Sequence, residues 1–285
     1  MNILQISDIH LKSKYDDQFP AEQHLNAIIN ETKDQSFDAV VLTGDLADDS
    51  EDCSMAARYG DYAGLFITLR NAYGEDTPIL VTPGNHDVRS DLEEAYEDFC
   101  KGKSWQTSGR FSKVGSFNNP GESLIVLKIP NYYRSIILMD TGHKEFPYES
   151  MCRVAAHMNH PEHQRYMLFT HMPIIRPFHL FMNEPQSTIS DDDNVFLSML
   201  ATTGCDAILC GHYHSESHMM AFGIHQYAAP ASQVQIDPYT NPCNPSGNFP
   251  GYAIIKDNGQ FEYSTHYIIN KDAKSTTHRL KAVSL

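Results

Sequence analysis

Five short apolar runs in this chain each end on a cluster of Asp, Asn or His residues. With the residues that follow them, the runs read NILQISDIH, DAVVLTGD, PILVTPGNHD, RYMLFTHMP and DAILCGHYH. Short runs rich in Val, Ile and Leu are typical of strands that are buried inside a sheet. In α/β sheets the ligand-binding crevice lies beyond the carboxyl ends of the strands. We therefore expect the polar ends of these strands to meet at one place.

Helical patterns alternate with the first of these strands. Leu25, Ile28 and Ile29 recur at helical spacing. Two further helices are predicted from capping boxes at Ser90–Glu93 and Ser190–Asp193. The second half of the chain reads mainly as more strands. These patterns predict an α/β (α+β) fold in which two packed mixed β-sheets are flanked by helices, as an αββα sandwich.

The apolar segments follow one another without a spacer. No Pro/Gly/Ser-rich linker, repeat or low-complexity run divides the 285 residues. We expect one domain over residues 1–270 and a polar C-terminal tail over residues 271–285.

The net charge of the chain restricts its partners. The formal charge is −15, from 36 Asp and Glu against 21 Lys and Arg, so the field should repel a long nucleic acid. A small phosphate ester is still compatible, because bound cations invert the charge of a site locally. Six scattered cysteines without a C-x-x-C pair favour a reducing compartment. With no signal-peptide pattern and no long apolar run, we expect a soluble, cytoplasmic protein that does not bind membranes.

The strand ends offer a mixed set of oxygen and nitrogen ligands without a thiolate. The set is Asp8, His10, Asp45, Asn85, His171, His212 and His214. Such ligands suit Mn, Fe or Zn, and residue types do not choose among these three metals. Seven candidates are too many for one tetrahedral ion but suit two ions roughly 3.5–4 Å apart that share a carboxylate, as in displacement at phosphorus. We therefore expect two divalent or trivalent metal ions as cofactors, at the carboxyl ends of the strands.

Some of these residues also have structural interpretations. Asp45 could cap the following helix and Asn85 could stabilise a turn, but the other candidate ligands expected beside them favour metal binding. His212 and His214 lie at i and i+2, so a turn must splay them if each is to reach a different ion. Gly211 would permit the close backbone approach that this requires.

Taken in order, the motifs D-x-H, G-D, G-N-H-D, a lone H and G-H-x-H over residues 8–214 resemble the calcineurin-like metallophosphoesterase superfamily. The resemblance implies one ion on Asp8, His10, Asp45 and His214, and another on Asp45, Asn85, His171 and His212. Asp45 is then the bridge, and a hydroxide between the ions is the nucleophile. The family pattern also implies that His86 is the catalytic acid and that Asp48 orients it. Asn85, His86 and His212 are the expected substrate-binding residues.

The strongest resemblance is to the bacterial class III cyclic-nucleotide (cAMP) phosphodiesterases. It is carried by ISDIHL, GDLADD, TPGNHD, THMP, CGHYH and AAPASQVQIDP, and then by GYAIIKDNGQFE. This implies a dinuclear-metal phosphodiesterase that acts on a small cyclic or linear nucleotide.

Three segments, 101–122, 142–164 and 176–190, do not fit that resemblance, and we interpret them as loops that line the cleft. Within them, Trp105, Phe178 and Phe181 could stack on a base or simply pack in the core.

Alternatives to a nucleotide phosphodiesterase stay open. The same superfamily includes phosphomonoesterases and diesterases of non-nucleotide esters such as phospholipid headgroups. A catalytically silent protein-binding scaffold is the alternative from another class, but a scaffold has no need for His86 beside a complete ligand set. The sequence leaves open whether the chain forms a homodimer.

Overall fold

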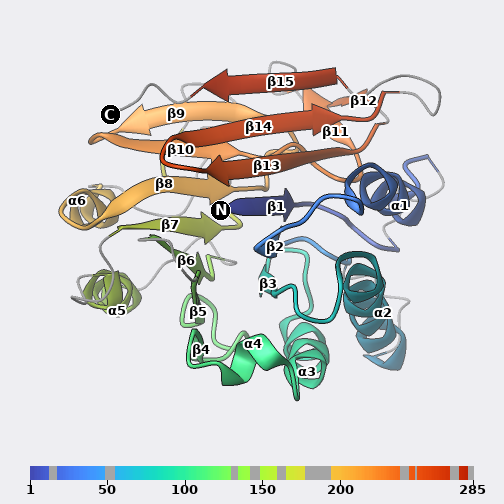
Figure 1. The fold of residues 1–285 in the computed structure, drawn as a ribbon, viewed down its shortest axis with the longest axis horizontal. Helices are drawn as coiled ribbons and strands as arrows, with labels where there is room; N and C mark the ends of the chain where they lie inside the picture. Colours follow the sequence, from blue (N-terminus) through green and yellow to red (C-terminus); the bar gives the residue numbers. More distant parts are fainter. Residues whose placement is uncertain are drawn as a thin grey trace.

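The chain folds into two large β-sheets with helices on their outer faces, as the computed structural model shows (Figure 1). The structure describes residues 1–12, 18–48, 55–129, 134–141, 148–158, 165–176, 194–237, 244–247, 249–269 and 276–281. The predicted architecture of two packed mixed sheets is confirmed.

The first sheet has six strands in the order β15-β14-β13-β1-β2-β3. Their bounds are β1 (Asn2–Ile6), β2 (Ala39–Thr43), β3 (Ile79–Thr82), β13 (Gly251–Asp257), β14 (Phe261–Tyr267) and β15 (Thr276–Lys281). β1, β2 and β3 are parallel, so their carboxyl ends share one edge, while β13 runs antiparallel to β1. Three of the five predicted site-bearing strands therefore lie side by side in this sheet.

The second sheet has seven strands in the order β4-β5-β6-β7-β8-β10-β9. Their bounds are β4 (Phe111–Val114), β5 (Leu124–Lys128), β6 (Arg134–Met139), β7 (Arg165–Thr170), β8 (Cys205–Cys210), β9 (Ser217–Ala221) and β10 (Ile224–Ala228). β6, β7, β8 and β10 are parallel. A small separate ribbon pairs β11 (Gln235–Asp237) with β12 (Asn244–Gly247).

Alternate residues of the second sheet face different layers, as the two-residue period of a strand requires. On β7, for example, Met167 and Phe169 pack with the core of the first sheet and its helices, whereas Tyr166 and Leu168 pack with the outer helices. The helices beside the first sheet are α1 (Ala21–Thr32), α2 (Met55–Tyr73) and α3 (Arg89–Cys100), and the short α4 (Ser104–Thr107) packs against β4 of the second sheet. The outer helices on the opposite side are α5 (Tyr148–Met158) and α6 (Val195–Ala201) (Figure 1). The two sheets thus pack face to face between helical layers.

The helix face predicted from Leu25, Ile28 and Ile29 is confirmed, because all three are buried in α1. The capping box predicted at Ser90–Glu93 is wrong. The helix begins two residues earlier than this box implies, with Val88 as its N-cap, and the Glu93 carboxylate instead accepts a hydrogen bond from Lys113 at 2.6 Å. Glu93 is thus used to attach β4 to α3 rather than to close the helix end. The capping box predicted at Ser190–Asp193 lies outside the described residues.

Two segments that were interpreted as loops contain regular structure. Segment 101–122 holds α4 and β4, and segment 142–164 holds α5. Trp105 is 1 % exposed and packs edge-on against Phe111, so it belongs to the core and does not face a substrate. Phe178 and Phe181 lie outside the described residues.

Part of the predicted C-terminal tail also has regular structure, because residues 276–281 form the edge strand β15. Among the described helices, none combines the length and the apolar character needed to cross a membrane.

Candidate metal centre

The predicted ligands lie on the loops that follow five strands of the two sheets. Asp8 and His10 follow β1, Asp45 follows β2, Asn85 follows β3, His171 follows β7, and His212 and His214 follow β8. The two sheets meet where β1 approaches β8: Gln5 donates to the Cys210 carbonyl at 3.1 Å, and the His212 N–H donates to the Asp8 carboxylate at 3.1 Å. The structure therefore brings ligands from both sheets to one place.

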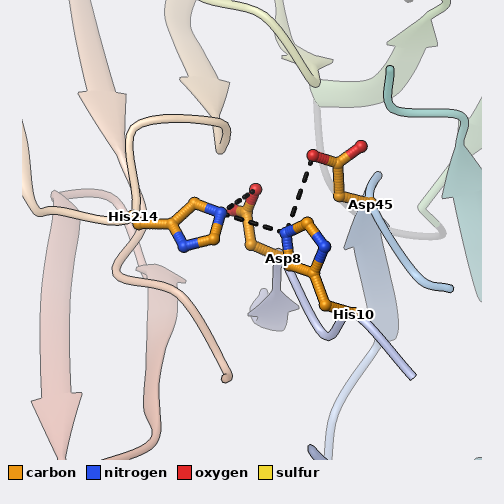
Figure 2. A group of neighbouring side chains, drawn as sticks. All are labelled: Asp8, His10, Asp45 and His214. Atoms are coloured by element: carbon orange, nitrogen blue, oxygen red, sulfur yellow. Dashed lines mark hydrogen bonds and ion pairs between the residues drawn. The ribbon is translucent and has the colours of Figure 1, made fainter. Parts of the chain in front are cut away.

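One cluster consists of Asp8, His10, Asp45 and His214, all of which point toward one another (Figure 2). The Nε2 atoms of His10 and His214 are 3.0 Å apart. Asp45 Oδ2 is 3.8 Å from His10 Nε2, and Asp8 Oδ1 is 3.5 Å from His214 Nε2. One potential ligand atom from each residue lies within 4.8 Å of the others, so these atoms could surround a single ion.

A second cluster shares Asp45 with the first one. It joins Asp45, His171 and His212, with Asp45 Oδ2 at 3.3 Å from His171 Nε2. His212 Nδ1 lies 3.2 Å from the same nitrogen, and Asn85 Oδ1 lies 2.9 Å from it. Asp45 is thus the one described residue common to both clusters, which is the position expected of a bridging ligand.

Three of the histidines are oriented through their Nδ1 atoms. His171 donates Nδ1–H to the Thr43 carbonyl at 2.8 Å, and His214 donates to the Val234 carbonyl at 3.0 Å. His10 Nδ1 lies 2.5 Å from the Asp48 carboxylate. Since a carbonyl can only accept, the proton of a neutral His171 or His214 sits on Nδ1, and the Nε2 lone pair faces the cluster. These two carbonyls are functional groups that the sequence analysis missed, and side-chain motifs carry no signal for them.

Charge in the clusters is unevenly distributed. Burial lowers the pKa of His10, but the Asp48 hydrogen bond and the charge of Asp45 outweigh it and raise the pKa to about 9. The pKa of His171 also rises to about 9, because the charge of Asp45 outweighs burial. Burial and the neighbouring His171 lower the pKa of His212 to about 4. The buried carboxylates thus stabilise positive charge on the groups around them.

The donor set fits divalent cations. In His214 the Nε2 lone pair faces the Nε2 atom of His10 at 3.0 Å, with two carboxylates beside the pair. A metal ion can accept both nitrogen lone pairs and balance the carboxylate charge at once. The two overlapping clusters provide for two such ions.

The backbone of the ligand loops is strained. Five of the predicted ligands have positive φ angles: Asp8 (54°), His10 (51°), Asp45 (52°), His212 (70°) and His214 (51°). Residues other than glycine rarely adopt this region, which costs about 1–3 kcal/mol per residue and occurs mainly at functional sites. Five of the eight non-glycine residues with positive φ in the described part of the chain are therefore predicted ligands.

The predicted splaying of His212 and His214 is confirmed. His212 Nδ1 lies beside His171, whereas His214 Nε2 lies beside His10. The close approach predicted at Gly211 is confirmed too, because a Cβ atom there would lie 1.8 Å from Ser7 Oγ.

His86 and Asp48 lie beside the first cluster. The His86 side chain is 51 % exposed, and its ring packs edge-on against His10. Asp48 lies between two histidines: its Oδ1 is 2.5 Å from His10 Nδ1 and 3.7 Å from His86 Nδ1, which is within ion-pair distance of His86 but beyond hydrogen-bonding distance. In this structure the carboxylate orients His10, and spacing in the sequence could not tell which histidine is nearer.

Known proteins resemble this chain along most of its length. The family description "Calcineurin-like phosphoesterase" matches residues 1–216. A protein of Vesicomyosocius okutanii subsp. Calyptogena okutanii, described as a "Probable cyclic nucleotide phosphodiesterase", is 23% identical over 278 residues, which are 94% of this chain and 99% of that protein. A similarly described protein of Fibrobacter succinogenes is 23% identical over 281 residues, covering 95% of this chain and 94% of its own. In a solved structure, a dimetal phosphatase from Danio rerio has the same fold, with a TM-score of 0.63 and 12% identity over 97% of this chain and 98% of that one.

Proposed function

The chain belongs to the calcineurin-like phosphoesterase family and is a metal-dependent phosphoester hydrolase, and we propose that it hydrolyses a small cyclic or linear nucleotide phosphodiester. The observation that carries the proposal is the pair of ligand clusters that share Asp45. Two ions held by a common carboxylate can engage both the attacking and the leaving oxygen of an in-line displacement.

In this proposal, Asp8, His10 and His214 hold one ion with Asp45. Asn85, His171 and His212 hold the other with Asp45. The bound ions would polarise the phosphoryl group and activate a water molecule for attack. The protein side chains fix the positions of these groups before substrate binds, which is where such a site gains most of its rate.

His86 is the proposed proton donor to the leaving oxygen. Its side chain is half exposed, which leaves it accessible to a substrate. Its backbone N–H donates to Asp45 Oδ1 at 2.8 Å, so its position is tied to the residue shared by both clusters. Asn85 and His212 lie in the second cluster and are the proposed contacts to the phosphate alongside His86.

Two observations favour a cyclic nucleotide among these phosphodiesters. The two relatives described as cyclic-nucleotide phosphodiesterases cover nearly the whole chain. The segment AAPASQVQ, which resembles the class III enzymes, contacts the ligand loops directly: Ser232 N–H donates to the Ser7 carbonyl at 2.8 Å, and Gln233 N–H donates to the Asp8 carbonyl at 3.1 Å. The segment that carries this resemblance thus supports the backbone of a ligand loop, which favours the proposal. Mn and Fe are the metals we propose to test first.

A substrate panel tests the proposal. Protein reconstituted with Mn²⁺ is assayed on 3′,5′-cyclic AMP, 2′,3′-cyclic AMP, a linear dinucleotide, glycerophosphocholine and AMP. We expect the largest kcat/KM on one of the nucleotide diesters. A larger value on AMP would indicate a phosphomonoesterase, and a larger value on glycerophosphocholine would indicate a headgroup diesterase; either result contradicts the proposal.

A further inference from the structure

The buried carboxylate of Asp87 connects the loops that follow β2 and β3. Its Oδ1 accepts hydrogen bonds from the backbone N–H groups of Leu46 at 2.9 Å and Ala47 at 3.2 Å. Its Oδ2 accepts one from Gly84 N–H at 2.8 Å. Leu46 and Ala47 directly follow Asp45, and Gly84 lies just before the other loop's ligand. One carboxylate therefore sets the spacing between loops that supply both ions.

Tyr62, on α2, holds this carboxylate in place. Its hydroxyl lies 3.1 Å from Asp87 Oδ1 and 3.0 Å from the backbone nitrogen of Val88. Because Val88 N–H can only donate, the single Tyr62 hydrogen must be donated to Asp87. Burial and the charge of Asp87 raise the pKa of Tyr62, so the hydroxyl stays protonated and keeps this role. Tyr62 thus holds Asp87 both through its side chain and through the following backbone amide.

Asp87 needs this support because its carboxylate and that of Asp45 are both buried. Asp87 is 7 % exposed and Asp45 is 1 % exposed. The Asp45 carboxylate accepts the backbone N–H of His86, the residue directly before Asp87, at 2.8 Å, so two groups of like charge lie close together and repel each other. Hydrogen-bond donors that converge on Asp87 offset this repulsion and keep the loops close. Without the Tyr62 hydroxyl, Asp87 loses one donor and Val88 loses its acceptor, and both loops can shift.

We propose that Tyr62 is a positioning residue for the metal centre, and that it acts through Asp87 on the distance between Asp45 and Asn85. The inference rests on the proposed function, since it presupposes two ions in the clusters. Removing the hydroxyl should therefore weaken metal binding more than it changes the fold.

Tyr96 offers a matched control. It is another fully buried tyrosine, and its hydroxyl donates to the backbone carbonyl of Ile79 at 3.1 Å. Tyr62→Phe and Tyr96→Phe each delete one buried hydroxyl, but only Tyr62 touches Asp87. Chelator-treated wild-type protein and both variants are titrated with Mn²⁺, and the free Mn²⁺ is followed by its electron paramagnetic resonance signal. Circular dichroism melting of the metal-free proteins shows whether each variant is folded.

We expect wild type and Tyr96→Phe to bind two Mn²⁺ ions with the same dissociation constants. In Tyr62→Phe, the Mn²⁺ ion that binds less tightly should have a dissociation constant roughly tenfold higher, as is common when a residue behind metal ligands is lost. Equal dissociation constants in all three proteins would overturn the inference and leave the proposed function standing. A Tyr62→Phe variant that fails to fold while Tyr96→Phe folds would also overturn the inference, because Tyr62 would then stabilise the fold rather than position the metal ligands. A wild-type protein that binds no Mn²⁺ would overturn both proposals.

Discussion

The Nε2 atoms of His10 and His214 lie 3.0 Å apart although the residues are 204 positions apart in the sequence. They come from the loops after β1 and β8, which belong to different sheets. The packing of one sheet on the other is therefore a condition for this centre. A change that separates the sheets should abolish metal binding even if each sheet survives.

Asp45→Asn should abolish binding of both ions and turnover while sparing the fold. The carboxylate takes part in both clusters, and an amide supplies neither the negative charge nor a second oxygen. The fold should persist because the Asn oxygen can still accept the His86 N–H that Asp45 Oδ1 accepts now. Metal content after dialysis, measured by mass spectrometry, checks the prediction. Two tightly bound ions in the variant would contradict the assignment of Asp45 as the bridge.

Asp48→Asn should weaken the binding of one metal ion roughly 10- to 100-fold, because Asp48 orients His10. The measurement is a Mn²⁺ titration beside kcat. If Asp48 acted through His86 instead, as the sequence pattern suggested, kcat would fall while both dissociation constants stayed at the wild-type values.

His86→Ala should leave metal content unchanged and lower kcat by a factor of about 10² to 10⁴, the usual loss when a general acid is removed. The loss should be smaller on an ester with a nitrophenolate leaving group, which needs no proton. The control is therefore the same variant on bis-p-nitrophenyl phosphate. An unchanged rate on a cyclic nucleotide would refute the role of His86 as acid.

Gly211→Ala should lower the free energy of unfolding by about 1–3 kcal/mol, the usual cost of overpacking. The new Cβ would lie 1.8 Å from Ser7 Oγ and 2.8 Å from Asp8 Oδ2, so metal binding should weaken as well. Gly60→Ala is the control, since a Cβ on this residue of α2 meets nothing within 4 Å and alanine favours a helix by about 1 kcal/mol. Urea unfolding of the two variants checks that Gly211→Ala lowers the free energy of unfolding while Gly60→Ala raises it. If Gly211→Ala were as stable as Gly60→Ala, the close approach at Gly211 would not restrict the residue at this position.

The sequence predicted the buried strands well, because their apolar runs are continuous and end in turn residues. It also placed the candidate metal ligands at the strand ends, since parallel strands share a carboxyl edge. It missed β4, and it missed α5 although Met151, Val154 and Met158 recur there at helical spacing and are buried. Contacts made across the fold were equally invisible: Glu93 bonds to Lys113 rather than closing its helix, and Asp48 is nearer to His10 than to His86. Such choices depend on which loops the packed sheets bring together.

The ratio of kcat/KM for bis-p-nitrophenyl phosphate to that for p-nitrophenyl phosphate tests the central claim most directly. It is measured on Mn²⁺-reconstituted protein and on protein treated with chelator. If the chain is a dinuclear-metal phosphodiesterase, the diester is favoured clearly over the monoester and both activities disappear with the chelator. A preference for the monoester, or activity that survives complete removal of metal, would contradict the account.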